Sequence, residues 1–165
     1  MELSTFIAIT PQLIIAAGIV LAMLLVAWQR SQRLIASFTT GVLLITAVAT
    51  ISAIGSGQQM VTLLLEVDDY SRFALLLILF ASLASVLLSH QVLAKQVEVH
   101  DEYYLLLLLM VLGAGVLVVS HHFASLFLGF ESLSISLVGL VGYFRQGKFS
   151  VETGFKYLIL SASAS

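Results

Sequence analysis

The sequence predicts an all-α membrane protein, a polytopic bundle of transmembrane helices. Of its 165 residues, 60% are apolar and only 10% are charged, and the mean hydropathy is +1.10. Soluble domains are about 45–50% apolar and about 25% charged, so a soluble fold of this composition would expose large apolar patches. The chain has no cysteine, which excludes disulfides, thiolate metal sites and cysteine-bound iron–sulfur clusters within it.

Apolar segments of membrane-spanning length predict the individual helices. About 20 apolar residues cross the hydrocarbon core as a helix, and five segments are of that order: residues 11–28, 34–54, 73–93, 103–120 and 123–144. Pro11 is expected to open the first helix, because proline suits the first helical turn. A sixth segment begins near Ser150 and is still apolar at Ser165. We therefore expect five complete helices and the start of a sixth, with residues 1–165 forming the N-terminal part of a longer membrane domain.

The basic residues predict how the chain is oriented in the membrane. The first, third and fifth connections together hold five of them, whereas the second and fourth hold one: Arg30, Arg33, Lys95, Arg145 and Lys148 against Arg72. Short connections rich in lysine and arginine stay in the cytoplasm. The odd-numbered connections are therefore expected inside, and the N-terminus outside the cytoplasm.

A single carboxylate, Glu131, lies near the middle of the fifth apolar segment. An acid at that depth costs roughly 2.5–3.5 kcal/mol on insertion scales. At 100° per residue, a stripe of small or weakly polar residues falls within about 60° of its direction: Ala124, Ser134, Val138 and Gly142. Such a stripe is expected to face protein or water rather than lipid. Glu131 is then either half of a structural ion pair that locks two helices, or a titrating carboxylate in a proton path.

Lys156, in the sixth segment, is open to two interpretations. It follows Glu152 by four residues, the spacing and order that favour an ion pair on a helix surface, with the amine reaching toward the membrane boundary. Alternatively it is a relay amine in a proton path. In upright helices Glu131 lies about 21 Å and Lys156 about 9 Å from the basic turn between them. A direct salt bridge would therefore need tilt, a broken helix or a bridging water.

The other polar groups are interpreted as parts of helix boundaries. Adjacent histidines do not share a helix face, so His121 and His122 are expected to form a polar turn rather than a metal site. The second connection is expected to be a solvated loop with a local ion pair, formed by Glu66, Asp68, Asp69 and Arg72. The sequence contains no dinucleotide fingerprint, phosphate loop or nucleophile elbow, and no basic patch that indicates nucleic acid as a partner.

The residues from 124 to the end of the chain resemble the antiporter-like membrane subunits of respiratory complex I, and look most like the N subunits of bacterial NADH–quinone oxidoreductases. The specific part is the spacing from Glu131 through Gly142-Tyr143 to Lys156-Tyr157 and the final Ser-Ala-Ser. The runs Val67-Asp68 and 101–104 (Asp-Glu-Tyr-Tyr) support it. Ser136 departs from the pattern, since many relatives carry proline there, and this affects the aim of the Glu131 side chain.

The resemblance implies a fold built from inverted repeats. It implies a proton-translocating subunit of NADH:quinone oxidoreductase, a translocase of a bacterial inner (plasma) membrane. Its partners would be other complex I membrane subunits and the lipid bilayer, and NADH, FMN, iron–sulfur clusters and quinone would bind to other subunits. Carried over by position, Glu131 and Lys156 are the proton-translocation residues, with the main partner lysine of Glu131 beyond Ser165. A cation/proton antiporter subunit of the same superfamily, or a non-pumping scaffold subunit, remains as an alternative.

Overall fold

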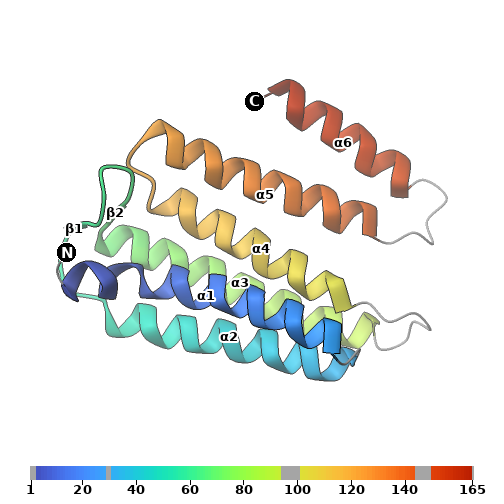
Figure 1. Ribbon diagram of the computed structural model, residues 1–165, viewed down its shortest axis with the longest axis horizontal. Helices are drawn as coiled ribbons and strands as arrows, with labels where there is room; N and C mark the ends of the chain where they lie inside the picture. Colours follow the sequence, from blue (N-terminus) through green and yellow to red (C-terminus); the bar gives the residue numbers. More distant parts are fainter. Residues whose placement is uncertain (1–2, 29–30, 94–100, 144–149, 165) are drawn as a thin grey trace.

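The computed structural model describes residues 3–28, 31–93, 101–143 and 150–164. Within these ranges the chain forms helices and one small hairpin: α1 (Leu3–Trp28), α2 (Gln32–Ser52), β1 (Gln59–Met60), β2 (Glu66–Val67), α3 (Asp69–Leu93), α4 (Asp101–Val118), α5 (Phe123–Tyr143) and α6 (Ser150–Ala164). The helices lie side by side, and each runs antiparallel to the one before it (Figure 1). Helices α1 to α4 pack together, α5 packs on α4, and α6 packs on α5.

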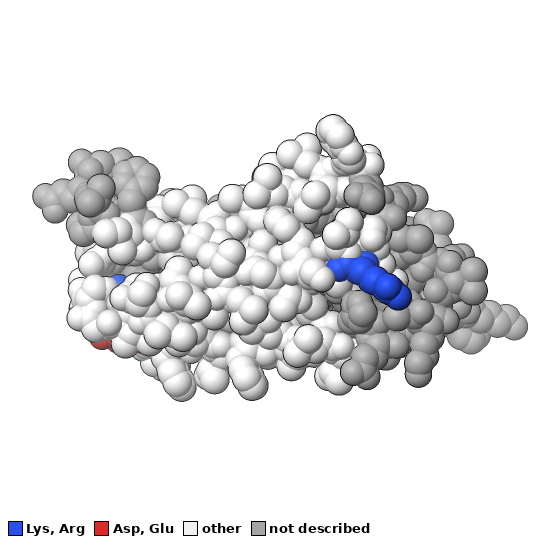
Figure 2. Space-filling model, turned by 90° about the horizontal axis from the view of Figure 1, so that it is seen from below, with Lys and Arg blue, Asp and Glu red and all other residues white. Residues whose placement is uncertain are grey.

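The first five helices are long and apolar enough to cross a membrane, which confirms the prediction of five complete spans. Their outer faces carry many large exposed apolar side chains, such as Leu24, Val48, Leu77 and Leu88. Figure 2 shows a surface of uncharged residues over most of its length, and the charged side chains in this view lie toward its two ends. Of the basic residues that predicted the orientation, Arg33 is described, whereas Arg30, Lys95, Arg145 and Lys148 lie outside the described residues.

The predicted start of the first helix was wrong. Helix α1 begins at Leu3, and Pro11 lies inside it. Proline lacks the N–H that would bond the carbonyl four residues earlier, but neighbouring groups in a membrane bundle often satisfy the freed carbonyl. Pro11 is buried and lines a small cavity together with Thr50 of α2 and Leu75 of α3. Packing against neighbouring helices therefore accommodates a residue that would end an isolated helix.

Helices α4 and α5 approach each other backbone to backbone. A Cβ atom added at Gly113 of α4 would lie 2.8 Å from the backbone nitrogen of Leu133 and 3.1 Å from the carbonyl oxygen of Gly129. A Cβ atom at Gly129 of α5 would lie 3.0 Å from the backbone nitrogen of Leu117. Glycine lets membrane helices pack this closely. The helix that carries Glu131 is thus held tightly against the four-helix group.

The hairpin of β1 and β2 covers one end of the bundle, here called the hairpin end. Its strands pair antiparallel, with Gln59 opposite Val67, and two glycines with positive φ, Gly55 (85°) and Gly57 (75°), precede it. The amide of Glu66 donates to the carbonyl of Val119, 2.9 Å away, so the hairpin joins the α4–α5 turn. The N-terminus lies at this end (Figure 1). The opposite end is where α1, α3 and α5 finish.

Candidate functional site

Glu131 lies on α5 and faces a groove between α5 and α6. The groove is lined by Glu131, Ser134, Ile135, Val138, Leu158 and Ser161. Two members of the predicted stripe, Ser134 and Val138, are among these residues, so the stripe faces a neighbouring helix as expected. Within the described part of the chain, the Glu131 carboxylate makes no hydrogen bond or ion pair. The groove thus presents a membrane-depth carboxylate beside two serine hydroxyls and otherwise apolar walls.

Lys156 lies on α6 and pairs with Glu152 of the same helix, Nζ to Oε1, at 2.5 Å. Both side chains are more than half exposed, 70% for Lys156 and 54% for Glu152. This is the helix-surface pair that the spacing of the two residues favours.

The structure does not bring Glu131 and Lys156 together. Their positions along the helix axes can be compared because Gly154 of α6 contacts Gly142 of α5. A Cβ atom added at Gly154 would lie 3.3 Å from the Gly142 Cα atom, so these two glycines are at the same level. From this level Glu131 is eleven residues, or about 16 Å, toward the hairpin end, whereas Lys156 is two residues, or about 3 Å. The two groups therefore differ in height by roughly 13 Å, close to the separation expected from the sequence.

The opposite end of α5 is tied to α4 by a hydrogen bond that sequence analysis missed. The Tyr143 hydroxyl donates to Glu102 Oε2 at 2.6 Å. Glu102 and the fully buried Asp101 form the first turn of α4, where acidic residues are favoured by the helix dipole. A second bond, 2.7 Å between the hydroxyls of Ser89 and Tyr103, ties α3 to α4. This acidic turn on α4 was readable from the sequence, but its partner Tyr143, 41 residues away, was not.

The two histidines lie at the hairpin end and have structural partners. His121 Nδ1 is 2.5 Å from Glu66 Oε2, which links the α4–α5 turn to β2. His122 Nδ1 accepts a hydrogen bond from the amide of Ala124 at 3.1 Å, so this side chain caps the start of α5. The predicted polar turn is confirmed. Among the described residues there is no group of three or more histidine, cysteine or acidic side chains that could hold a metal ion.

The prediction of a solvated second connection was wrong for Arg72. Its ion pair with Asp69 is confirmed at 2.7 Å, but the Arg72 side chain is only 3% exposed. Helix α3 begins at Asp69, so Arg72 lies within its first turn. Its Nη1 also donates to the carbonyl of Gly57 at 3.0 Å. The residues before β1 fold across the helix end and cover an arginine that composition alone would place in water.

Comparisons with known proteins agree with the fold. Residues 120–165 match the family described as NADH:quinone oxidoreductase/Mrp antiporter, TM, and this segment contains both Glu131 and Lys156. The structure is similar to a chain in respiratory complex I from Thermus thermophilus with bound Aureothin, with a TM-score of 0.80 and 24% sequence identity. The match covers 93% of this chain and 33% of that chain, so the present chain spans about a third of its length. The predicted all-α bundle of transmembrane helices is confirmed, and it shares its fold with that chain.

Proposed function

We propose that this chain is part of a proton-translocating membrane subunit of an NADH:quinone oxidoreductase. The observation that carries the proposal is the place of Glu131. It is a single carboxylate near the middle of a helix long and apolar enough to cross a membrane, it lines the groove between α5 and α6, and it lies in the segment that matches the antiporter family. Acidic residues in such positions commonly mark proton paths.

The proposed chemistry is a change in the charge state of Glu131. The carboxylate takes up a proton when a nearby positive charge moves away and releases it when that charge returns, because interacting sites titrate as a unit. The described residues supply no cation beside Glu131, so the partner is proposed to be a lysine beyond Ser165. Hydride and electron transfer, with NADH, FMN, iron–sulfur clusters and quinone, belong to other subunits in this proposal.

Lys156 is proposed as a second relay residue. It lies roughly 13 Å from Glu131 along the helix axes, so it acts through water or an intermediate group rather than by direct contact. Lys156→Gln should lower proton pumping, whereas Glu152→Gln, which breaks the same 2.5 Å ion pair, should leave pumping unchanged. Equal effects of the two substitutions on pumping would show that the pair is only structural.

The surroundings of the chain follow from the same proposal. The subunit would lie in a bacterial inner membrane with its N-terminus outside the cytoplasm, in contact with other complex I membrane subunits and lipid. The matched family also includes Mrp antiporters, so a cation/proton antiporter subunit is the second candidate. In a third possibility, the subunit is a scaffold that does not pump.

The test is to purify the tagged full-length subunit from its native membrane. The proposal expects flavin and iron–sulfur subunits to copurify, together with NADH:quinone oxidoreductase activity. An antiporter would instead purify without redox subunits and would exchange sodium or potassium for protons in vesicles. A scaffold would copurify with the redox subunits, but changes at Glu131 would leave pumping per electron untouched.

A further inference from the structure

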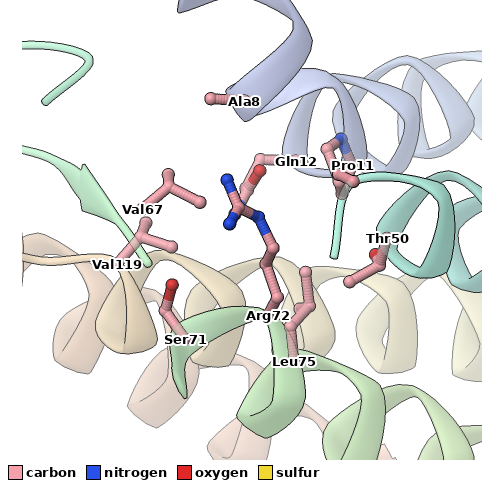
Figure 3. Close-up of a pocket in the computed structure, with 10 residues that line it drawn as sticks. Ala8, Pro11, Gln12, Thr50, Val67, Ser71, Arg72, Leu75 and Val119 are labelled. Carbon is pink, nitrogen blue, oxygen red and sulfur yellow. The ribbon is translucent and has the colours of Figure 1, made fainter. Parts of the chain in front are cut away.

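A small cavity at the hairpin end lies where α1, α2, α3 and the hairpin meet (Figure 3). Its volume is about 10 Å³, and its lining includes Gln12 of α1 and Arg72 of α3 with the apolar side chains of Val67, Leu75 and Val119. Figure 3 shows the guanidinium of Arg72 directed toward Gln12 and Ala8. The lining also includes Thr50 and Ser71, whose hydroxyls donate to the carbonyls of Thr46 and Asp68. Among the lining side chains, Gln12 and Arg72 are the two with buried polar atoms that have no partner among the described residues.

Arg72 has donors that no described residue uses. Its Nη1 atom is occupied, by Asp69 Oδ1 at 2.7 Å and by the Gly57 carbonyl at 3.0 Å. Its Nε and Nη2 atoms are buried and have no hydrogen-bond partner among the described residues. An arginine that is only 3% exposed cannot turn these donors to solvent. Buried donors of a charged group are costly to leave unpaired, so the cavity should hold an acceptor.

Gln12 has a buried hydrogen-bond acceptor that complements these donors. Its Oε1 atom is also buried without a hydrogen-bond partner in the described ranges. The species in the cavity must therefore accept from the guanidinium and donate to an amide oxygen. A chloride ion can accept but has no proton to donate. Water does both, and a cavity of about 10–15 Å³ is the smallest that holds one water molecule.

We propose that a single structural water molecule binds between Arg72 and Gln12. It accepts from Nε or Nη2 of Arg72 and donates to Oε1 of Gln12, so it connects α1 to α3. Because Arg72 also holds the carbonyl of Gly57, the water extends one polar network from α1 through α3 to the segment before the hairpin. This inference does not depend on the function proposed above, since it concerns only how the hairpin end is held together.

The test is a map of the full-length protein in its native complex, at a resolution that shows ordered water. The proposal expects one isolated peak at hydrogen-bond distance, about 2.7–3.2 Å, from Gln12 Oε1 and from Nε or Nη2 of Arg72. Replacing chloride with bromide in the buffer should leave the peak height unchanged. A direct bond between Gln12 and Arg72 with no peak would overturn the proposal, and so would a peak that grows in bromide.

A variant tests the role of Gln12 separately. Gln12→Leu removes the acceptor but keeps a side chain of similar length, so the peak should be lost while Arg72 keeps its bonds to Asp69 and Gly57. Persistence of the peak at full height in Gln12→Leu would show that Gln12 does not hold the water. If that variant fails to assemble, the map of the unaltered protein still decides the proposal.

Discussion

Gly129→Ala should force α5 away from α4 and reduce the stability of the bundle. An alanine Cβ at this position would lie 3.0 Å from both Cγ and the backbone nitrogen of Leu117, and 3.1 Å from the carbonyl oxygen of Gly113. Ordinary contacts of a Cβ atom are 3.4–4 Å, so the helices would have to separate by a few tenths of an ångström. Two of the three atoms are backbone, so a side-chain rotation cannot relieve the clash.

The expected change in the free energy of unfolding follows from two opposing effects. Overpacking of this kind costs about 1–3 kcal/mol, while alanine favours the helix over glycine by about 1 kcal/mol. Gly41 of α2 is the matched control, because an added Cβ there meets nothing within 4 Å. Gly41→Ala keeps the propensity gain without the clash. The unfolding free energies of the two variants should therefore differ by about 1–3 kcal/mol, with Gly129→Ala the less stable.

The assay is denaturant unfolding of the full-length protein in mixed micelles, followed by far-ultraviolet circular dichroism. Both variants make the same chemical change in a helix, so their difference isolates the contact between α4 and α5. A Gly129→Ala protein as stable as Gly41→Ala would refute the close approach of these helices. It would also remove the reason for regarding Glu131, two residues further along, as rigidly placed.

Two further predictions concern the ends of the bundle. Tyr143→Phe removes the 2.6 Å hydrogen bond to Glu102 and should lower the unfolding free energy by about 1.5–3 kcal/mol, the usual range for a hydrogen bond to a charged group. Tyr157→Phe, on the more exposed α6, is the control and should change the unfolding free energy little. Equal losses in the two variants would contradict the prediction. The second prediction concerns the orientation in the membrane. Leu63 is 85% exposed at the hairpin end, so Leu63→Cys should react with an impermeant thiol reagent in intact cells, whereas Arg33→Cys should react only after the membrane is opened. The reverse pattern would place the N-terminus inside the cytoplasm.

Segment length and apolar content were enough to predict the five spans, because a membrane helix must satisfy its own backbone over about 20 residues. The same reasoning misplaced the start of α1. Proline was taken as a helix start, but the packing of Pro11 against its neighbours is a tertiary contact. The hairpin was also missed, since two-residue strands leave no alternating pattern. Gly55 and Gly57 were the available cue, because glycine readily adopts positive φ.

The candidate site was more predictable than its surroundings. Helical spacing alone placed Ser134 and Val138 on the face of Glu131, and helical rise alone predicted that Lys156 lies at another height. By contrast, the burial of Arg72 depends on a segment far back in the sequence that folds over the end of α3. Arg72 binds the carbonyl of Gly57, 15 positions earlier, and Asp69 accepts from the amide of Gly55, 14 positions earlier. Such long-range contacts come from tertiary structure, and no local pattern in the sequence encodes them.

The central claim is that Glu131 carries protons, and the most direct measurement is the number of protons pumped per electron in reconstituted vesicles that contain the complete complex. Glu131→Gln keeps the shape of the side chain and removes its titration, so the ratio should fall while assembly stays intact. Glu131→Asp keeps a titrating group with a shorter reach and should be milder. A fully assembled Glu131→Gln complex that pumps the normal number of protons per electron would remove Glu131 from the proton path.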